Sequence, residues 1–106
     1  MRASSILSVA FIGLASAALP KANEYKSGDC SGAMNYEHHS ALLSHVTMDD
    51  TTHSVYITGN FIGYTGKTGN GGSCTGEALI IMNHACNNLD TVYPGKRIKC
   101  LRYVGN

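Results

Sequence analysis

Residues 74–100 read CTGEALIIMNHACNNLDTVYPGKRIKC, and this stretch decides the fold that the sequence predicts. Its apolar residues recur at three- and four-residue spacing, which is typical of one face of a helix. They are Ala78, Ile81, Met82, Ala85, Cys86 and Leu89. We therefore predict a helix that begins at Cys74, a tight connection over residues 90–95, and a strand that runs through Cys100.

The chain contains four cysteines, which are Cys30, Cys74, Cys86 and Cys100. In an exported protein an even number predicts disulfides, here two, each contributing roughly 2–4 kcal/mol. On one helix Cys74 and Cys86 would lie about 18 Å apart, whereas a bridge needs Cα atoms within about 7 Å. Two disulfide arrangements stay open: Cys30–Cys74 with Cys86–Cys100, or Cys30–Cys86 with Cys74–Cys100. A bridge from Cys30 to another chain also stays open.

The N-terminal residues predict export. Arg2 precedes an apolar run over residues 6–14, and the small residues 15–18 fit a signal-peptidase site. We assign residues 1–18 to a signal peptide and residues 19–29, which are polar and aperiodic, to a flexible arm. The remaining residues, 30–106, form one domain, which is small enough to need disulfide crosslinks.

The middle of the chain predicts strands. Residues 31–48 suggest one or two strands, and Val55 and Ile57 alternate within a β-rich segment after an Asp-Asp-Thr-Thr turn at residues 49–52. We expect a hairpin across this turn, with a helix over residues 49–58 as the alternative. The glycine-rich residues 59–73 predict a short edge strand and then a mobile loop. The expected fold class is α+β, a small two-layer sandwich with one or two helices on one face of an antiparallel sheet.

Charge and histidine spacing argue against two kinds of partner. Once Arg2 is removed, seven basic residues balance seven acidic ones, so net charge does not favour nucleic-acid binding. No histidine pair has the spacing of a helical zinc site, and the cysteines are expected to be oxidised. We therefore expect no metal, no cofactor and no nucleic-acid partner. The apolar run over residues 6–14 is too short to span a bilayer and no second one follows, so we also expect no stable membrane insertion.

One segment, residues 35–39, could carry acid–base chemistry. It is similar to the Tyr-x-His stretch of secreted fungal guanyl-specific ribonucleases, with Tyr36 and His38 at the matching positions. That resemblance implies Glu37 or Glu77 as base and Arg97 as clamp. Those enzymes also use a second histidine near the C-terminus, and no histidine follows His84.

Four basic residues gather near the C-terminus: Lys96, Arg97, Lys99 and Arg102. On an edge strand they would guard against aggregation. Alternatively, they form a binding patch for an acidic partner.

The chain resembles small cysteine-rich effectors of plant-pathogenic fungi, in particular the secreted-in-xylem proteins of vascular-wilt Fusarium and their paired-effector relatives. The resemblance rests on Ser27-Gly-Asp-Cys30, on residues 48–56, on Cys74-Thr-Gly and on residues 93–100. It implies a non-enzymatic virulence protein of the host apoplast or host cell that cooperates with a second effector or a host plant protein. It also implies a killer-toxin-like sandwich of two helices on a four-stranded sheet, with membrane action as an alternative.

Overall fold

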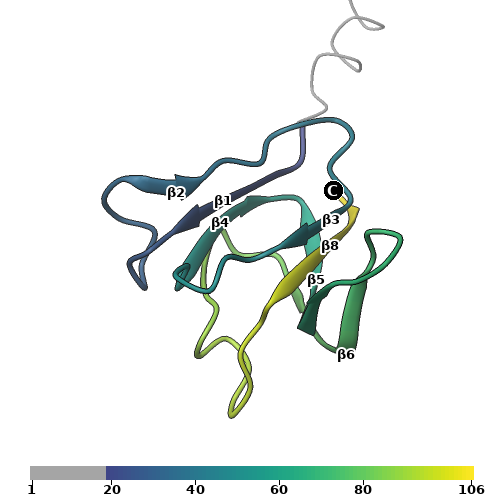
Figure 1. The fold of residues 1–106 in the computed structure, drawn as a ribbon. Coiled ribbons are helices and arrows are strands. Elements are labelled where there is room, and N and C mark those ends of the chain that lie inside the picture. Colours follow the sequence, from purple (N-terminus) through teal and green to yellow (C-terminus); the bar gives the residue numbers. More distant parts are fainter. Residues whose placement is uncertain (1–18) are drawn as a thin grey trace, which may run out of the picture.

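The computed structural model describes residues 19–106, and in this part of the chain every regular element is a strand (Figure 1). The eight strands form two four-stranded antiparallel sheets, with the order β2-β1-β4-β7 in the first and β3-β8-β5-β6 in the second. The first sheet contains β1 (Lys21–Tyr25), β2 (Met34–Tyr36), β4 (Ser54–Thr58) and β7 (Cys86–Asn88). The second contains β3 (His45–Thr47), β5 (Asn60–Thr68), β6 (Cys74–Met82) and β8 (Cys100–Gly105).

One apolar core lies between the sheets. Val55 and Ile57 of β4 face it, whereas Tyr56 between them is exposed, so the predicted alternation in this strand is confirmed. The second sheet contributes Phe61 and Leu101. The other buried members of the cluster are Ala22, Val46, Met48, Met82, Leu89 and Ile98. Residues from both sheets therefore bury one another, as in a β-sandwich.

The predicted helix over residues 74–89 is wrong, because this segment forms β6 and β7. Gly76 has a φ of +78°, which lies outside the helical region and which glycine adopts without a Cβ clash. Within the expected apolar stripe Met82 and Leu89 are buried, but Ile81 is 61% exposed. The α+β fold class is therefore corrected to all-β within residues 19–106. The resemblance-implied helices and the alternative helix over residues 49–58 are likewise absent from this part of the chain.

The segment predicted to be a flexible arm instead provides β1, which pairs with β2 on one side and β4 on the other. The turn at residues 49–52 is present, but it does not close a hairpin. It connects β3 in one sheet to β4 in the other. The expected short edge strand is also corrected, since β5 extends to Thr68 and lies between β8 and β6. The predicted signal peptide, residues 1–18, lies outside the described residues.

Two disulfides join the elements, as predicted from the cysteine count. They are Cys30–Cys86 and Cys74–Cys100, one of the two arrangements left open by the sequence. All four cysteines pair within the chain, so Cys30 has no free thiol for another chain. The rejected pair, Cys74 with Cys86, is absent, although the reason differs: the two residues lie on strands of different sheets, not on one helix.

Candidate functional site

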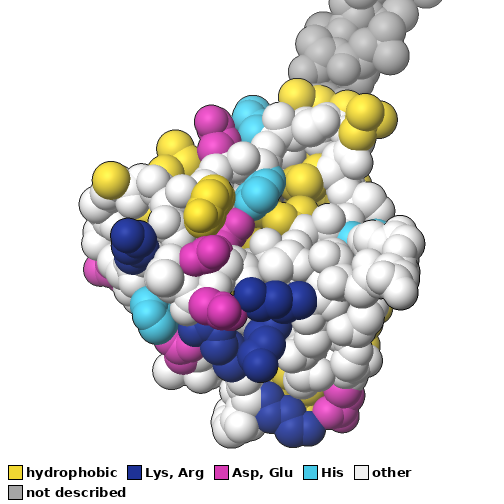
Figure 2. All heavy atoms as spheres, viewed as in Figure 1, with side chains coloured by type: hydrophobic (Ala, Val, Ile, Leu, Met, Phe, Trp, Pro, Cys, Tyr) yellow, Lys and Arg dark blue, Asp and Glu magenta, His cyan; other side chains and the backbone are white. Residues whose placement is uncertain are grey.

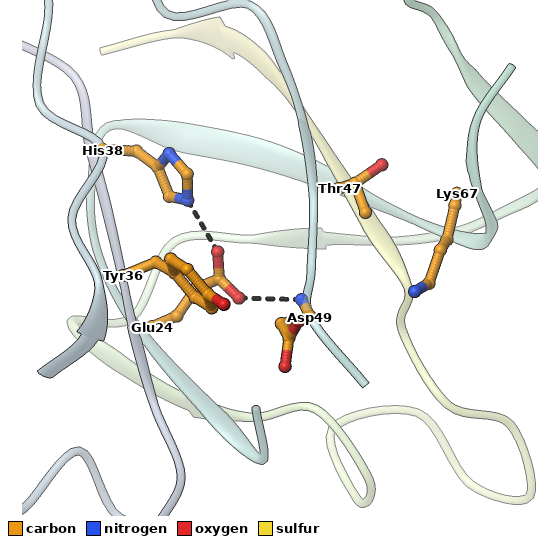
Figure 3. Close-up of a pocket in the computed structure, with 6 residues that line it drawn as sticks. All are labelled: Glu24, Tyr36, His38, Thr47, Asp49 and Lys67. Atoms are coloured by element: carbon orange, nitrogen blue, oxygen red, sulfur yellow. Dashed lines mark hydrogen bonds and ion pairs between the residues drawn. The ribbon is translucent and has the colours of Figure 1, made fainter. Parts of the chain in front are cut away.

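A hollow of about 190 Å³ lies between residues of the two sheets. Its lining residues are Glu24 of β1, Tyr36 of β2, His38, Thr47 of β3, Asp49 and Lys67 of β5 (Figure 3). The sandwich therefore brings four separate segments of the chain to one place.

Glu24 is the central group of the hollow. It is 1% exposed, and its position opposite Val55 on β4 turns its side chain toward the inner face of the sheet. One carboxylate oxygen lies 2.6 Å from Nε2 of His38, while the other accepts hydrogen bonds from the Asp49 backbone N–H at 2.8 Å and from the Thr52 hydroxyl at 2.7 Å. A buried carboxylate is tolerated when its oxygens are filled in this way. Glu24 thereby ties β1 to the turn that connects the sheets.

His38 is held by both its backbone and its ring. Its N–H donates to the side-chain oxygen of Asn23, and its carbonyl accepts from Ala22 at 2.8 Å. Because a carboxylate only accepts, Nε2 carries the proton in the bond to Glu24. Within residues 19–106 the other ring nitrogen, Nδ1, makes no hydrogen bond, and the side chain is 29% exposed. Nδ1 is therefore oriented to accept a proton or a hydrogen bond from a ligand.

Charged groups surround the opening of the hollow. Lys67 Nζ lies 2.8 Å from Asp50, and this hydrogen bond lowers the pKa of the Asp50 carboxyl below its usual value. The hydroxyl and backbone N–H of Thr51 bind the Asp49 carboxylate and lower its pKa, with a smaller contribution from Lys67. Both aspartates are thus ionised at neutral pH, beside one cation.

The structure assembles part of the predicted acid–base group. Tyr36 and His38 do line one site, but the carboxylate beside them is Glu24, whereas Glu37 is exposed outside the hollow. Glu77 binds Lys96 at 2.6 Å. Sequence reasoning missed Glu24 because it lies in the segment taken for an arm, and a single glutamate between Asn23 and Tyr25 gives no signal of burial.

Arg97, the predicted clamp, is committed elsewhere. It donates to Asp90 at 2.7 Å and to the carbonyl oxygens of Asp49 and Thr52. Its guanidinium therefore binds the turn at residues 49–52 and is not among the residues that line the hollow.

Three of the four C-terminal basic residues have partners within the chain. Lys96 pairs with Glu77, Arg97 pairs with Asp90, and Arg102 contacts Tyr64. Lys99 is exposed and precedes β8. Acidic side chains lie beside the Lys and Arg side chains on the face shown in Figure 2. The prediction that these basic residues protect an edge strand is wrong, because β8 lies between β3 and β5.

The histidines are dispersed over the described part of the chain. His38 contacts Glu24, His53 contacts Asp90, and His45 accepts from the Cys74 N–H. No cluster of three His, Cys, Asp or Glu side chains among residues 19–106 could hold a metal ion. This same part contains no helix long and apolar enough to cross a membrane.

Comparison with known proteins gives no further assignment. No family model, no curated protein and no solved structure matches the chain.

Proposed function

We propose that this is a secreted protein that acts by binding and not by turnover, with the hollow between the sheets receiving a side chain of a protein partner. The observation that carries the proposal is Glu24, whose carboxylate accepts from three donors of the protein itself. A carboxylate engaged in this way stabilises the walls of a site, and a general base would need an oxygen open to the substrate.

The size of the hollow supports a side chain as its ligand. Sites for small-molecule substrates enclose about 300–1,000 Å³, and this hollow offers about 190 Å³. Tyr36 presents its ring at the opening and is 51% exposed. Tyrosine is enriched at the centres of protein interfaces because it combines a large apolar ring with a hydroxyl.

The two disulfides are compatible with an extracellular protein. Together with the predicted signal peptide and the resemblance to fungal effectors, they support a virulence role in the host apoplast or host cell. The partner is then a second secreted effector or a host plant protein.

A pair of tyrosine variants tests the hollow. Tyr36→Ala removes the exposed ring at the opening, whereas Tyr56→Ala removes a tyrosine from the opposite, outer face of the same sheet. Each purified protein is used to capture partners from infected plant tissue. We expect a specific partner that the wild type and Tyr56→Ala retain and that Tyr36→Ala loses. Equal retention by both variants contradicts a role for the hollow.

A second candidate function rests on His38. Its imidazole is oriented by Glu24, makes no hydrogen bond through Nδ1 to any of residues 19–106, and lies beside Tyr36. This arrangement is suited to proton transfer. Incubation with RNA and with cell-wall polymers decides between the candidates. The binding proposal expects no cleavage; cleavage that disappears in His38→Ala and persists in the exposed neighbour variant His39→Ala would establish an enzyme instead.

A further inference from the structure

A row of four residues crosses the second sheet from edge to edge. His45 of β3 lies opposite Arg102 of β8, Arg102 lies opposite Ile62 of β5, and Ile62 lies opposite Ile81 of β6. Directly opposed residues project from the same face of a sheet. Their sequence neighbours that fill the core are Val46, Phe61, Leu101 and Met82. The row therefore occupies the side of the second sheet that faces away from the core, where Ile81 is exposed and the other three residues are half-buried.

Arg102 provides an unpaired charge in this row. Its Nε donates to the Tyr64 hydroxyl at 3.0 Å, and its guanidinium lies 6.0 Å from the centre of the Tyr64 ring. The tyrosine thus fixes the guanidinium and leaves both Nη atoms without a hydrogen bond inside the described structure. No carboxylate among residues 19–106 lies within ion-pair distance of Arg102. A fixed guanidinium with unfilled donors is suited to bidentate binding of a carboxylate.

His45 adds a second donor next to Arg102. Its Nδ1 accepts the Cys74 backbone N–H at 3.1 Å, so Nδ1 is unprotonated and Nε2 carries the proton of the neutral ring. On the other side of Arg102 the row is apolar. Ile62 is half-buried, and Ile81, on the edge strand β6, is 61% exposed.

We infer that this outer face docks a segment of a protein partner that presents a carboxylate flanked by apolar side chains. Charge complementarity identifies the carboxylate, because Arg102 and His45 offer donors that no described residue fills. Ile62 and Ile81 provide the apolar contacts beside it. This surface is distinct from the hollow, so its test does not depend on the proposed function of the hollow.

The test uses two capped tripeptides, acetyl-Leu-Glu-Leu-amide and acetyl-Leu-Gln-Leu-amide, titrated into isotope-labelled full-length mature protein and followed by NMR. We expect saturable shifts at the backbone amides of Ile62, Ile81 and Arg102 with the glutamate peptide. An exposed ion pair contributes roughly a two- to fivefold difference in affinity, so the glutamine peptide should bind more weakly by that factor. The variant Arg102→Gln should remove the preference between the two peptides.

Matched controls separate this site from general charge effects. Lys26→Gln removes an exposed cation from the segment that follows β1 and should leave both affinities unchanged. Ile81→Ser should weaken both peptides while keeping the preference for glutamate, and it remains informative if Arg102→Gln does not fold. Equal binding of the two peptides, shifts that do not saturate, or an equal loss in Lys26→Gln would overturn the inference. So would inorganic phosphate that shifts the same signals at lower concentration than the peptide, because the surface would then serve a phosphate group.

Discussion

The Glu24 carboxylate lies 2.6 Å from Nε2 of His38, and this pair joins the first strand of the domain to the segment that follows β2. The other oxygen of Glu24 holds the turn at residues 49–52. One buried side chain thus fixes three segments around the hollow. The walls of the candidate site and the crossover between the two sheets therefore depend on the same group.

Replacement of Glu24 should be among the most destabilising single changes in the chain. Glu24→Ala leaves the partly buried Asp49 N–H and the buried Thr52 hydroxyl without an acceptor, and an orphaned buried group costs about 1–3 kcal/mol. Glu24→Gln keeps one acceptor oxygen and should lose less. Urea unfolding with the disulfides intact measures both.

The control for Glu24 is Glu37→Gln, because Glu37 is exposed and directly follows Tyr36, the residue of β2 that pairs with Glu24. The free energy of unfolding of this variant should lie within about 0.5 kcal/mol of the wild-type value. A Glu24→Ala protein as stable as Glu37→Gln would show that the turn finds other acceptors.

Arg97 and Lys96 are adjacent and equally charged, but their contributions to stability should differ. Arg97 binds Asp90 and two backbone carbonyls of the turn, so Arg97→Ala leaves acceptors unfilled and should cost about 1–3 kcal/mol. Lys96 makes an exposed pair with Glu77, and such pairs contribute about 0–1 kcal/mol. Thermal unfolding of the two alanine variants compares them directly, and a larger loss for Lys96→Ala would contradict the assignment.

The sequence predicted the local structure of this fold better than it predicted which strands pair with one another. The alternation of Val55 and Ile57, the turn at residues 49–52 and the number of disulfides all follow from nearest-neighbour chemistry, and the structure confirms them. The predicted hairpin across that turn is wrong, because a turn specifies only a change of chain direction. The sheet that each flanking strand joins depends on distant pairing partners, β8 for β3 and β1 for β4.

The helix over residues 74–89 failed for a related reason. A short apolar run such as Leu79–Met82 fits both a helix face and a strand. Two features of the structure favour the strand. The backbone of Gly76 lies outside the helical region, and Ile81 of β6 pairs with Ile62 of β5. The candidate site shows the same limit, because Tyr36 and His38 are visible as a local motif while Glu24 reaches them only through strand pairing.

Stability should fall in acid partly through Asp90. The hydrogen bond from His53, and secondarily the charge of Arg97, hold the pKa of Asp90 below its usual value of 3.8. A depressed pKa in the folded state contributes stability above the unfolded value, and that stability is lost as pH falls through the folded pKa. The loss should therefore begin near pH 4 and continue below it.

The comparison of wild type with Asp90→Asn isolates this contribution. Asp90 is well exposed, so the difference in unfolding free energy at pH 7 should be at most about 1 kcal/mol. Urea midpoints measured from pH 7 to pH 2.5 should converge for the two proteins below pH 4. A difference that stays constant over this range would exclude a role for the Asp90 carboxylate in acid unfolding.

The two disulfides should contribute similar stability for different reasons. Cys30–Cys86 closes 56 residues and Cys74–Cys100 closes 26, and loop entropy alone gives about 4 and about 3.5 kcal/mol for the two. Cys100 is fully buried, however, so its replacement also removes packing in the core. We compare the double variants Cys30→Ala/Cys86→Ala and Cys74→Ala/Cys100→Ala. Their losses in unfolding free energy should agree within about 1 kcal/mol. Peptide mapping of the non-reduced protein provides the control, because a fragment that links Cys30 to Cys74 would contradict the connectivity on which both values depend.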